Sequence, residues 1–151
     1  MIERCLTVDH DAWLSLRMAL WPECTAERHA SEMSNFCANP DRFAQFVAYD
    51  GARNPVGLVE VALRSDYVNG TTTTPVGFLE GIYVVPQARL KGLARALVAR
   101  AEQWAVGVGC SEFASDARLE NVASHAMHRA LGFSETDRVV YFRKGLHENV
   151  A

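Results

Sequence analysis

The sequence predicts an α+β fold with a central mixed, mostly antiparallel sheet flanked by helices. Three observations predict it: consecutive β-type runs in the middle of the chain, a strongly periodic helix after them, and alternating strand and helix patterns in the C-terminal third. A chain of 151 residues is long enough for one domain with a substantial core and short for two. We therefore expect a single domain over 1–145 and a C-terminal tail over 146–151.

The N-terminal third is typical of one strand followed by two helices. Residues 2–8 form a β-type run. After it, Asp9 or Asp11 can cap a helix that continues to Trp21, where the following proline stops it. We expect a second helix to begin at Thr25, a residue type that caps helices well.

Three β-type runs occupy the middle of the chain. The runs over 42–50 and 55–65 are separated by a short segment that contains an Asp-Gly turn signal, so they predict a hairpin. A polar loop over 66–75 separates this hairpin from the third run, over 76–85. The sheet is therefore expected to be antiparallel up to this point.

The C-terminal half begins with the strongest helical pattern of the chain. Apolar residues recur at three- and four-residue spacing over 91–108, and a glycine ends the pattern. A short strand over 111–115, a helix over 121–131 and final β-type runs over 134–144 follow.

The composition excludes several classes of protein. A net charge of -3 gives no overall field to attract nucleic acid, and no stretch approaches the roughly 20 apolar residues of a membrane span. The start of the chain lacks the pattern of a secretion signal. The four cysteines are scattered without a Cys-x-x-Cys pair, which is typical of reduced thiols in the cytoplasm. We therefore expect a cytoplasmic protein that binds neither membranes nor nucleic acid.

The segment RLKGLAR, over 89–95, joins the third β-type run to the periodic helix. The first N–H groups of a helix have no partners within it, and the helix dipole favours an anion there. Gly92 and Ala94 keep side chains out of the way, while Arg89, Lys91 and Arg95 add positive charge. These features favour a cradle for a diphosphate; a helix start with solvated basic residues is the alternative.

Two common phosphate-binding patterns do not fit this segment. It lacks the Gly-Lys-Ser/Thr ending that holds magnesium on a nucleoside triphosphate, and it lacks the three-glycine fingerprint of dinucleotide sites. A diphosphate carrier bound without magnesium fits better.

The segment YVVPQARLKGLARALV resembles the coenzyme A motif of the GCN5-related N-acetyltransferase (GNAT) superfamily, and ENVASHAMHRALGF resembles the helix that follows in that fold. The resemblance spans nearly the whole chain and implies a sheet splayed at the cofactor cleft, with acetyl-CoA as co-substrate and no metal. The cofactor-binding residues that it implies are Ile82, Tyr83, Val84, Arg89, Leu90, Lys91, Gly92, Leu93, Ala94, Arg95 and Asn121.

Five further segments, from Leu20–Glu23 to Gly132–Lys144, jointly resemble the aminoglycoside 6'-N-acetyltransferases, which inactivate antibiotics such as kanamycin and tobramycin. Such substrates carry several ammonium groups, so a pocket that holds them should present carboxylates. By the resemblance, the residues at substrate-contacting positions are Trp21, Tyr67, Glu80, Asp116 and Asp137. The three acids are expected to converge where the sheet splays, and Trp21 and Tyr67 offer flat faces to sugar rings.

The implied reaction is direct transfer of the acetyl group to the 6'-amine, without an acyl-enzyme. Glu80 or Asp116 is the candidate base, directly or through water, and a backbone N–H near Tyr83 or Val84 can stabilise the oxyanion. Many family members protonate the departing thiolate with a Tyr, and this sequence has His128 at the matching place. His128 or a water is therefore the candidate acid.

Other functions remain open from the sequence. The same cofactor turn serves acetyltransferases for other amines, such as polyamines or protein N-termini, and it would also persist in a sensor of acyl-CoA without catalysis. A Cys-His acyl-enzyme through Cys24 or Cys110 is a further alternative. Related enzymes often dimerise through C-terminal strands, and the alternating run RVVYFRK suits such pairing, so a homodimer is expected.

Overall fold

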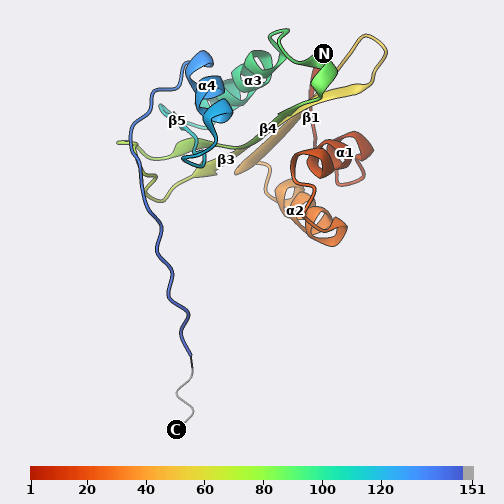
Figure 1. Ribbon diagram of the computed structural model, residues 1–151. Coiled ribbons are helices and arrows are strands. Elements are labelled where there is room, and N and C mark those ends of the chain that lie inside the picture. The colour runs from red at the N-terminus through yellow and green to blue at the C-terminus, as the bar shows by residue number, and fades with distance from the viewer. Residues whose placement is uncertain (148–151) are drawn as a thin grey trace.

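One sheet runs through the molecule, with helices on both of its faces (Figure 1). The computed structural model describes residues 1–147. Within them the sheet has five strands in sequential order, antiparallel except for the last pair, which is parallel. The strands are β1 (Ile2–Arg4), β2 (Phe43–Tyr49), β3 (Pro55–Arg64), β4 (Val76–Val84) and β5 (Phe113–Ala114).

The helices divide between the two faces of the sheet (Figure 1). They are α1 (Asp11–Leu20), α2 (Ala26–Ala38), α3 (Leu93–Gly107) and α4 (Val122–Ala130), with the 3-10 turn η1 (Pro86–Ala88) between β4 and α3. The helix α3 buries Leu97 and Ala101 against one face, whereas α1 and α2 bury Trp13 and Met33 against the other. None of the helices over residues 1–147 is long and apolar enough to cross a bilayer.

The predicted first helix is present, but the prediction of its cap was wrong. His10, not Asp9 or Asp11, is the N-cap, because its Nδ1 accepts a hydrogen bond from the backbone N–H of Trp13 at 3.1 Å. Asp11 instead occupies the first turn, where its charge favours the helix dipole. The second helix begins as predicted, with Thr25 as a cap that accepts from the N–H of Arg28.

The predicted final strand over 134–144 does not form. Residues 134–147 have no regular secondary structure, and in Figure 1 this segment extends away from the body of the protein. Val140, Tyr141 and Phe142 are 77%, 80% and 91% exposed. A β-type run becomes a strand only where a neighbouring strand supplies hydrogen bonds, and no described strand of the chain does so here. Residues 148–151 of the predicted tail lie outside the described residues.

The strands β4 and β5 separate soon after they meet. They pair only through Gly77 with Phe113 and Phe78 with Ala114. From Leu79 onward β4 stays paired to β3 alone, so its other edge is open toward the end of the strand. The predicted splay of the sheet is therefore present, and it lies directly before the turn that leads to α3.

Candidate active site

A β-bulge in β4 lies at the point where the sheet opens. Glu60 of β3 pairs with Gly81, whereas the next residue, Val61, pairs with Leu79, so Glu80 is an extra residue without a partner on β3. Bulges often re-aim side chains beside active sites. Here Leu79 and Ile82 pack on the α3 side, while Glu80 lines a pocket on the side of α1 and α2.

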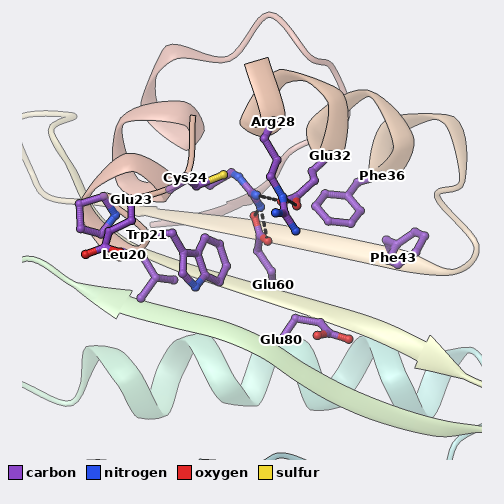
Figure 2. Close-up of a pocket in the computed structure, with 12 residues that line it drawn as sticks. Leu20, Trp21, Glu23, Cys24, Arg28, Glu32, Phe36, Phe43, Glu60 and Glu80 are labelled. Carbon is purple, nitrogen blue, oxygen red and sulfur yellow. Dashed lines mark hydrogen bonds and ion pairs between the residues drawn. The ribbon is translucent and has the colours of Figure 1, made fainter. Parts of the chain in front are cut away.

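The pocket beside the bulge has a volume of about 890 Å³ and lies between the sheet and the helices α1 and α2 (Figure 2). Carboxylates outnumber cations in its lining, which favours a cationic ligand. Its charged lining residues are Arg17, Glu23, Arg28, Glu32, Glu60 and Glu80, and its aromatic ones are Trp21, Phe36 and Phe43.

Trp21 packs directly on β4 where a glycine makes room for it. A Cβ atom added to Gly81 would lie 2.7 Å from two atoms of the Trp21 indole, so a larger residue there would displace the ring. The Arg17 guanidinium lies 4.8 Å from the centre of the same indole, a cation–π distance. The structure thus brings the predicted residues Trp21 and Glu80 together in one pocket.

A buried ionic network forms the floor of this pocket. Nη1 of Arg17 donates to both carboxylate oxygens of Glu60, at 2.5 and 2.7 Å, and the Trp13 indole N–H donates to Oε2 at 2.7 Å. Burial raises the pKa of the Glu60 carboxyl, and Arg17 opposes this effect by stabilising the charged form. Arg17 also donates to Glu32 and to Nδ1 of His29. The network therefore ties α1, α2 and β3 together.

Glu80 has a cationic neighbour on the adjacent strand. Nη2 of Arg64 donates to Oε1 of Glu80 at 2.8 Å. The guanidinium of Arg64 also stacks on the Phe78 ring, 3.5 Å from its centre. The Glu80 side chain is still 34% exposed, and the bonds from Arg64 use only one of its two oxygens. The other oxygen can accept from a bound ammonium group.

The other predicted substrate residues do not line this pocket. Tyr67 is 78% exposed and lines a smaller cavity of about 280 Å³ with residues of its own loop. Glu112 anchors this loop, because its Oε1 accepts from the hydroxyl of Thr73 and from backbone N–H groups, interactions that lower the pKa of its carboxyl. Asp116 and Asp137 are exposed beyond the ends of β5 and α4 and line neither cavity. The structure does not bring the three predicted acids into one pocket.

The segment that carries Asp137 nevertheless lies close to the loop of Tyr67. Gly70 has a left-handed φ of 80°, and a Cβ there would lie only 2.1 Å from Oγ1 of Thr136. The close approach explains a glycine at this position. The loop over 66–75 and the segment around Thr136 are therefore in contact with each other, apart from the pocket that Glu80 lines.

His128 is held by hydrogen bonds on both ring nitrogens. Nδ1 lies 2.7 Å from the carbonyl oxygen of Ser124, which can only accept, so this nitrogen carries a proton. Nε2 lies 2.8 Å from Oγ of Ser115, the residue before Asp116. His125 instead contacts the carbonyl of Arg118, and residues 1–147 contain no group of three or more His, Cys, Asp or Glu side chains that could hold a metal ion.

The turn before α3 has the geometry of an anion cradle. Gly92 caps the helix with a left-handed φ of 82°, no side chain caps the first N–H groups, and a Cβ at this position would meet no atom within 4 Å. Leu90 also has a positive φ, of 60°. Unpartnered N–H groups, open space and the positive end of the helix dipole together fit a diphosphate.

The polar residues predicted around the cradle make distinct contacts. Nε of Arg89 donates to the carbonyl of Val84, and Nη2 of Arg95 donates to the carbonyl of Ala130 at the end of α4. Lys91 is exposed in the turn. Asn121 caps α4 by accepting from the N–H of Ser124, which leaves its side-chain NH₂ group as a donor.

Sequence reasoning missed the charged residues that shape the pocket. Glu60 is an acid inside an otherwise apolar stretch of β3, and Arg17 lies on the buried face of α1. A charged residue at an inward position of an apolar element requires a partner of opposite charge. This rule could have predicted from the sequence that Arg17 and Glu60 are paired. Glu32 lies on the polar α2 and gave no comparable signal.

Comparisons with known proteins agree with this arrangement. The acetyltransferase (GNAT) family model matches residues 11–133. An aminoglycoside N(6')-acetyltransferase type 1 from Serratia marcescens is 50% identical over 148 residues, which cover 97% of this chain and 99% of that protein. One from Acinetobacter genomosp. 13 is 51% identical over 132 residues, or 87% of this chain and 89% of that protein.

Two solved structures share the fold over nearly the full length. The apo aminoglycoside antibiotic 6'-N-acetyltransferase AAC(6')-IG from Acinetobacter haemolyticus is 46% identical, with a TM-score of 0.90 and coverage of 97% of this chain and 99% of that one. AAC(6')-Iy in complex with the bisubstrate analog CoA-S-monomethyl-acetylneamine is 37% identical, with a TM-score of 0.91 and coverage of 97% and 98%. The predicted fold class is confirmed, and the chain belongs to the acetyltransferase (GNAT) family.

Proposed function

We propose that this chain is an aminoglycoside 6'-N-acetyltransferase that uses acetyl-CoA and confers resistance to these antibiotics. The observation that carries the proposal is the position of Glu80, which lines a carboxylate-rich pocket and also lies at the bulge where β4 leaves β5. Relatives at about half identity over nearly their whole length are named as enzymes of this activity. Acetyl-CoA is a metabolite of the cytoplasm, which is the location that we propose.

The chain would hold acetyl-CoA along the open edge of β4. The turn over 89–95 binds the diphosphate through backbone N–H groups, and the NH₂ group of Asn121 donates to the pantetheine arm. The backbone of Ile82, Tyr83 and Val84 lies along the same arm. When bound, the cofactor supplies an acetyl thioester at the bulge, so the reactive carbonyl and the acceptor amine meet at Glu80.

The acceptor occupies the pocket between the sheet and α1. The indole of Trp21 packs on β4 beside Glu80 and offers a flat face to a sugar ring. Glu80 accepts a hydrogen bond from the 6'-amino group through the oxygen that Arg64 leaves free. Tyr67 and Asp137 lie on the loop over 66–75 and the segment beside it, and they contact the more distant rings.

The reaction is a direct transfer in which the neutral amine attacks the thioester carbonyl. Glu80, or Asp116 through water, accepts the proton that the ammonium form loses. A backbone N–H near Tyr83 or Val84 donates to the oxyanion. The attacking nitrogen loses a second proton, to water, as it becomes the amide nitrogen. As the carbon–sulfur bond breaks, the thiolate takes a proton from His128 or from water, so the products are an amide and a free thiol. Positioning of both reactants contributes most of the acceleration, roughly 7 kcal/mol or more in well-oriented systems.

The proposed activity predicts release of free CoA when kanamycin or tobramycin is added with acetyl-CoA. An aminoglycoside with a hydroxyl in place of the 6'-amine should release none, because a hydroxyl is a much weaker acceptor. A thiol-reactive dye follows the reaction. Turnover on spermidine or peptides but not on kanamycin would contradict the proposal, as would binding of acetyl-CoA without turnover on any amine.

The role of Glu80 predicts a specific defect in Glu80→Gln. Loss of a general base costs about 10²- to 10⁴-fold in rate, so kcat should fall by about 100-fold or more while the KM for acetyl-CoA stays within about twofold. The acidic limb of the pH–rate profile should also change. Glu102→Gln, at an exposed site on α3, is the matched control. A kcat near that of the wild type with a profile of unchanged shape would exclude Glu80 as the base.

A homodimer is part of this proposal. The segment over 138–144 has four consecutive apolar or aromatic residues flanked by basic ones, is exposed, and extends away from the body of the subunit (Figure 1). Within the described residues, β5 pairs with β4 alone, so its outer edge is open. A second copy of the chain can bury the exposed run by pairing it with a strand edge, which removes Tyr141 and Phe142 from water.

The proposed dimer predicts a solution mass of two chains by light scattering. The double substitution Val140→Asp and Phe142→Asp should convert the protein to a monomer, because charged groups at these positions cannot be buried in the interface. Substitution of the exposed Val106 on α3 by Asp is the control and should leave the dimer intact. A wild-type monomer at micromolar concentration would contradict the dimer.

A further inference from the structure

An exposed ion pair lies at the pocket on the α2 side. Nε of Arg28 donates to Oε1 of Glu32 at 3.1 Å, and both residues line the pocket. The side chain of Arg28 is 74% exposed and that of Glu32 is 36% exposed. The order of the pair along the helix, with the cation N-terminal to the acid, is the weaker one, and Arg28 lies near the N-terminus of α2, where the helix dipole disfavours a cation. Another cation can therefore readily replace Arg28 at Glu32.

The carboxylate of Glu32, in contrast, is firmly oriented. Its Oε2 accepts from Nη2 of Arg17, whose side chain is only 1% exposed and is itself fixed by the buried Glu60. Figure 2 shows Glu32 reaching from α2 into the pocket, with Arg28 beside it. Since Arg17 occupies Oε2, the oxygen that Arg28 contacts is the one available to another cation.

Two of the other acids that line the pocket differ from Glu32. Glu60 is only 2% exposed, and both of its carboxylate oxygens already accept hydrogen bonds from Arg17 or Trp13, so it is less available to a ligand than Glu32. Glu80 lies on β4, on the opposite wall from Glu32 (Figure 2). A substrate with several ammonium groups can therefore be held at two ends, with one group at Glu80 and another at Glu32.

We propose that Glu32 is a further substrate-anchoring residue and that Arg28 is a stand-in cation which an ammonium group of the substrate displaces. The inference rests on the proposed function, because it concerns the binding of the same acceptor. When the exchange occurs, Glu32 keeps two cationic partners, Arg17 on one oxygen and the ammonium group on the other. The compact ammonium group binds within the pocket, whereas the displaced Arg28 returns to water.

Equilibrium binding of kanamycin tests the exchange without requiring turnover. Calorimetry with CoA present would compare the wild type, Arg28→Gln, Glu32→Gln and the double variant. Loss of the competitor in Arg28→Gln should lower Kd by about threefold, since exposed ion pairs are weak. Glu32→Gln should raise Kd by about tenfold or more, because it replaces a charge-assisted hydrogen bond by a neutral one. In the double variant, Arg28→Gln should add nothing to the effect of Glu32→Gln.

Arg53→Gln is the control for a general loss of positive charge. Arg53 pairs with Glu3 at 2.8 Å and does not line the pocket. An equal decrease of Kd in Arg53→Gln and Arg28→Gln would overturn the proposal, as would an unchanged Kd in Glu32→Gln with an unchanged melting temperature. Kanamycin binding without turnover would contradict the proposed function alone, and absence of binding to the wild type would contradict both.

Discussion

The irregular path of β4 is the constraint on which the rest of the site depends. The bulge at Glu80 directs this carboxylate into the pocket under α1, and Gly81 beside it leaves the space that the Trp21 indole fills. The same strand has already separated from β5 after Phe78, so from Leu79 onward its other edge is open toward the turn before α3. A regular strand paired on both edges would close the opening and remove the bulge that directs Glu80 into the pocket. In the proposed reaction, one strand therefore serves both reactants.

The buried network around Arg17 holds the opposite wall in place. A buried ion pair adds little net stability compared with apolar residues of the same shape, but removal of one partner leaves a charge unpaired at a cost of about 3–5 kcal/mol. The structural role of the Arg17–Glu60 pair is to link several elements, because the same guanidinium also contacts Glu32, His29 and the Trp21 ring. It thereby sets the distance between α2 and β3, and with it the width of the pocket.

Local patterns were sufficient to predict most of the fold. The cap at Thr25 and the spacing of Leu97 and Ala101 depend on contacts within one helix and on the face that it buries. The motif at the turn before α3 predicted a helix start without a side-chain cap, which is present. The bulge at Glu80 and the pairing of Arg17 with Glu60, 43 residues apart, arise only when distant strands and helices meet. The run over 138–144 has a strand pattern that requires a neighbouring strand, and the described chain provides none.

A crystal structure with both CoA and kanamycin tests the central claim most directly. The account predicts that the 6'-nitrogen lies within hydrogen-bond distance of Glu80 and beside the CoA sulfur, with the diphosphate at the turn over 89–95 and a second amino group at Glu32. Kanamycin bound only near Tyr67, with the pocket between β4 and α1 filled by solvent, would contradict it.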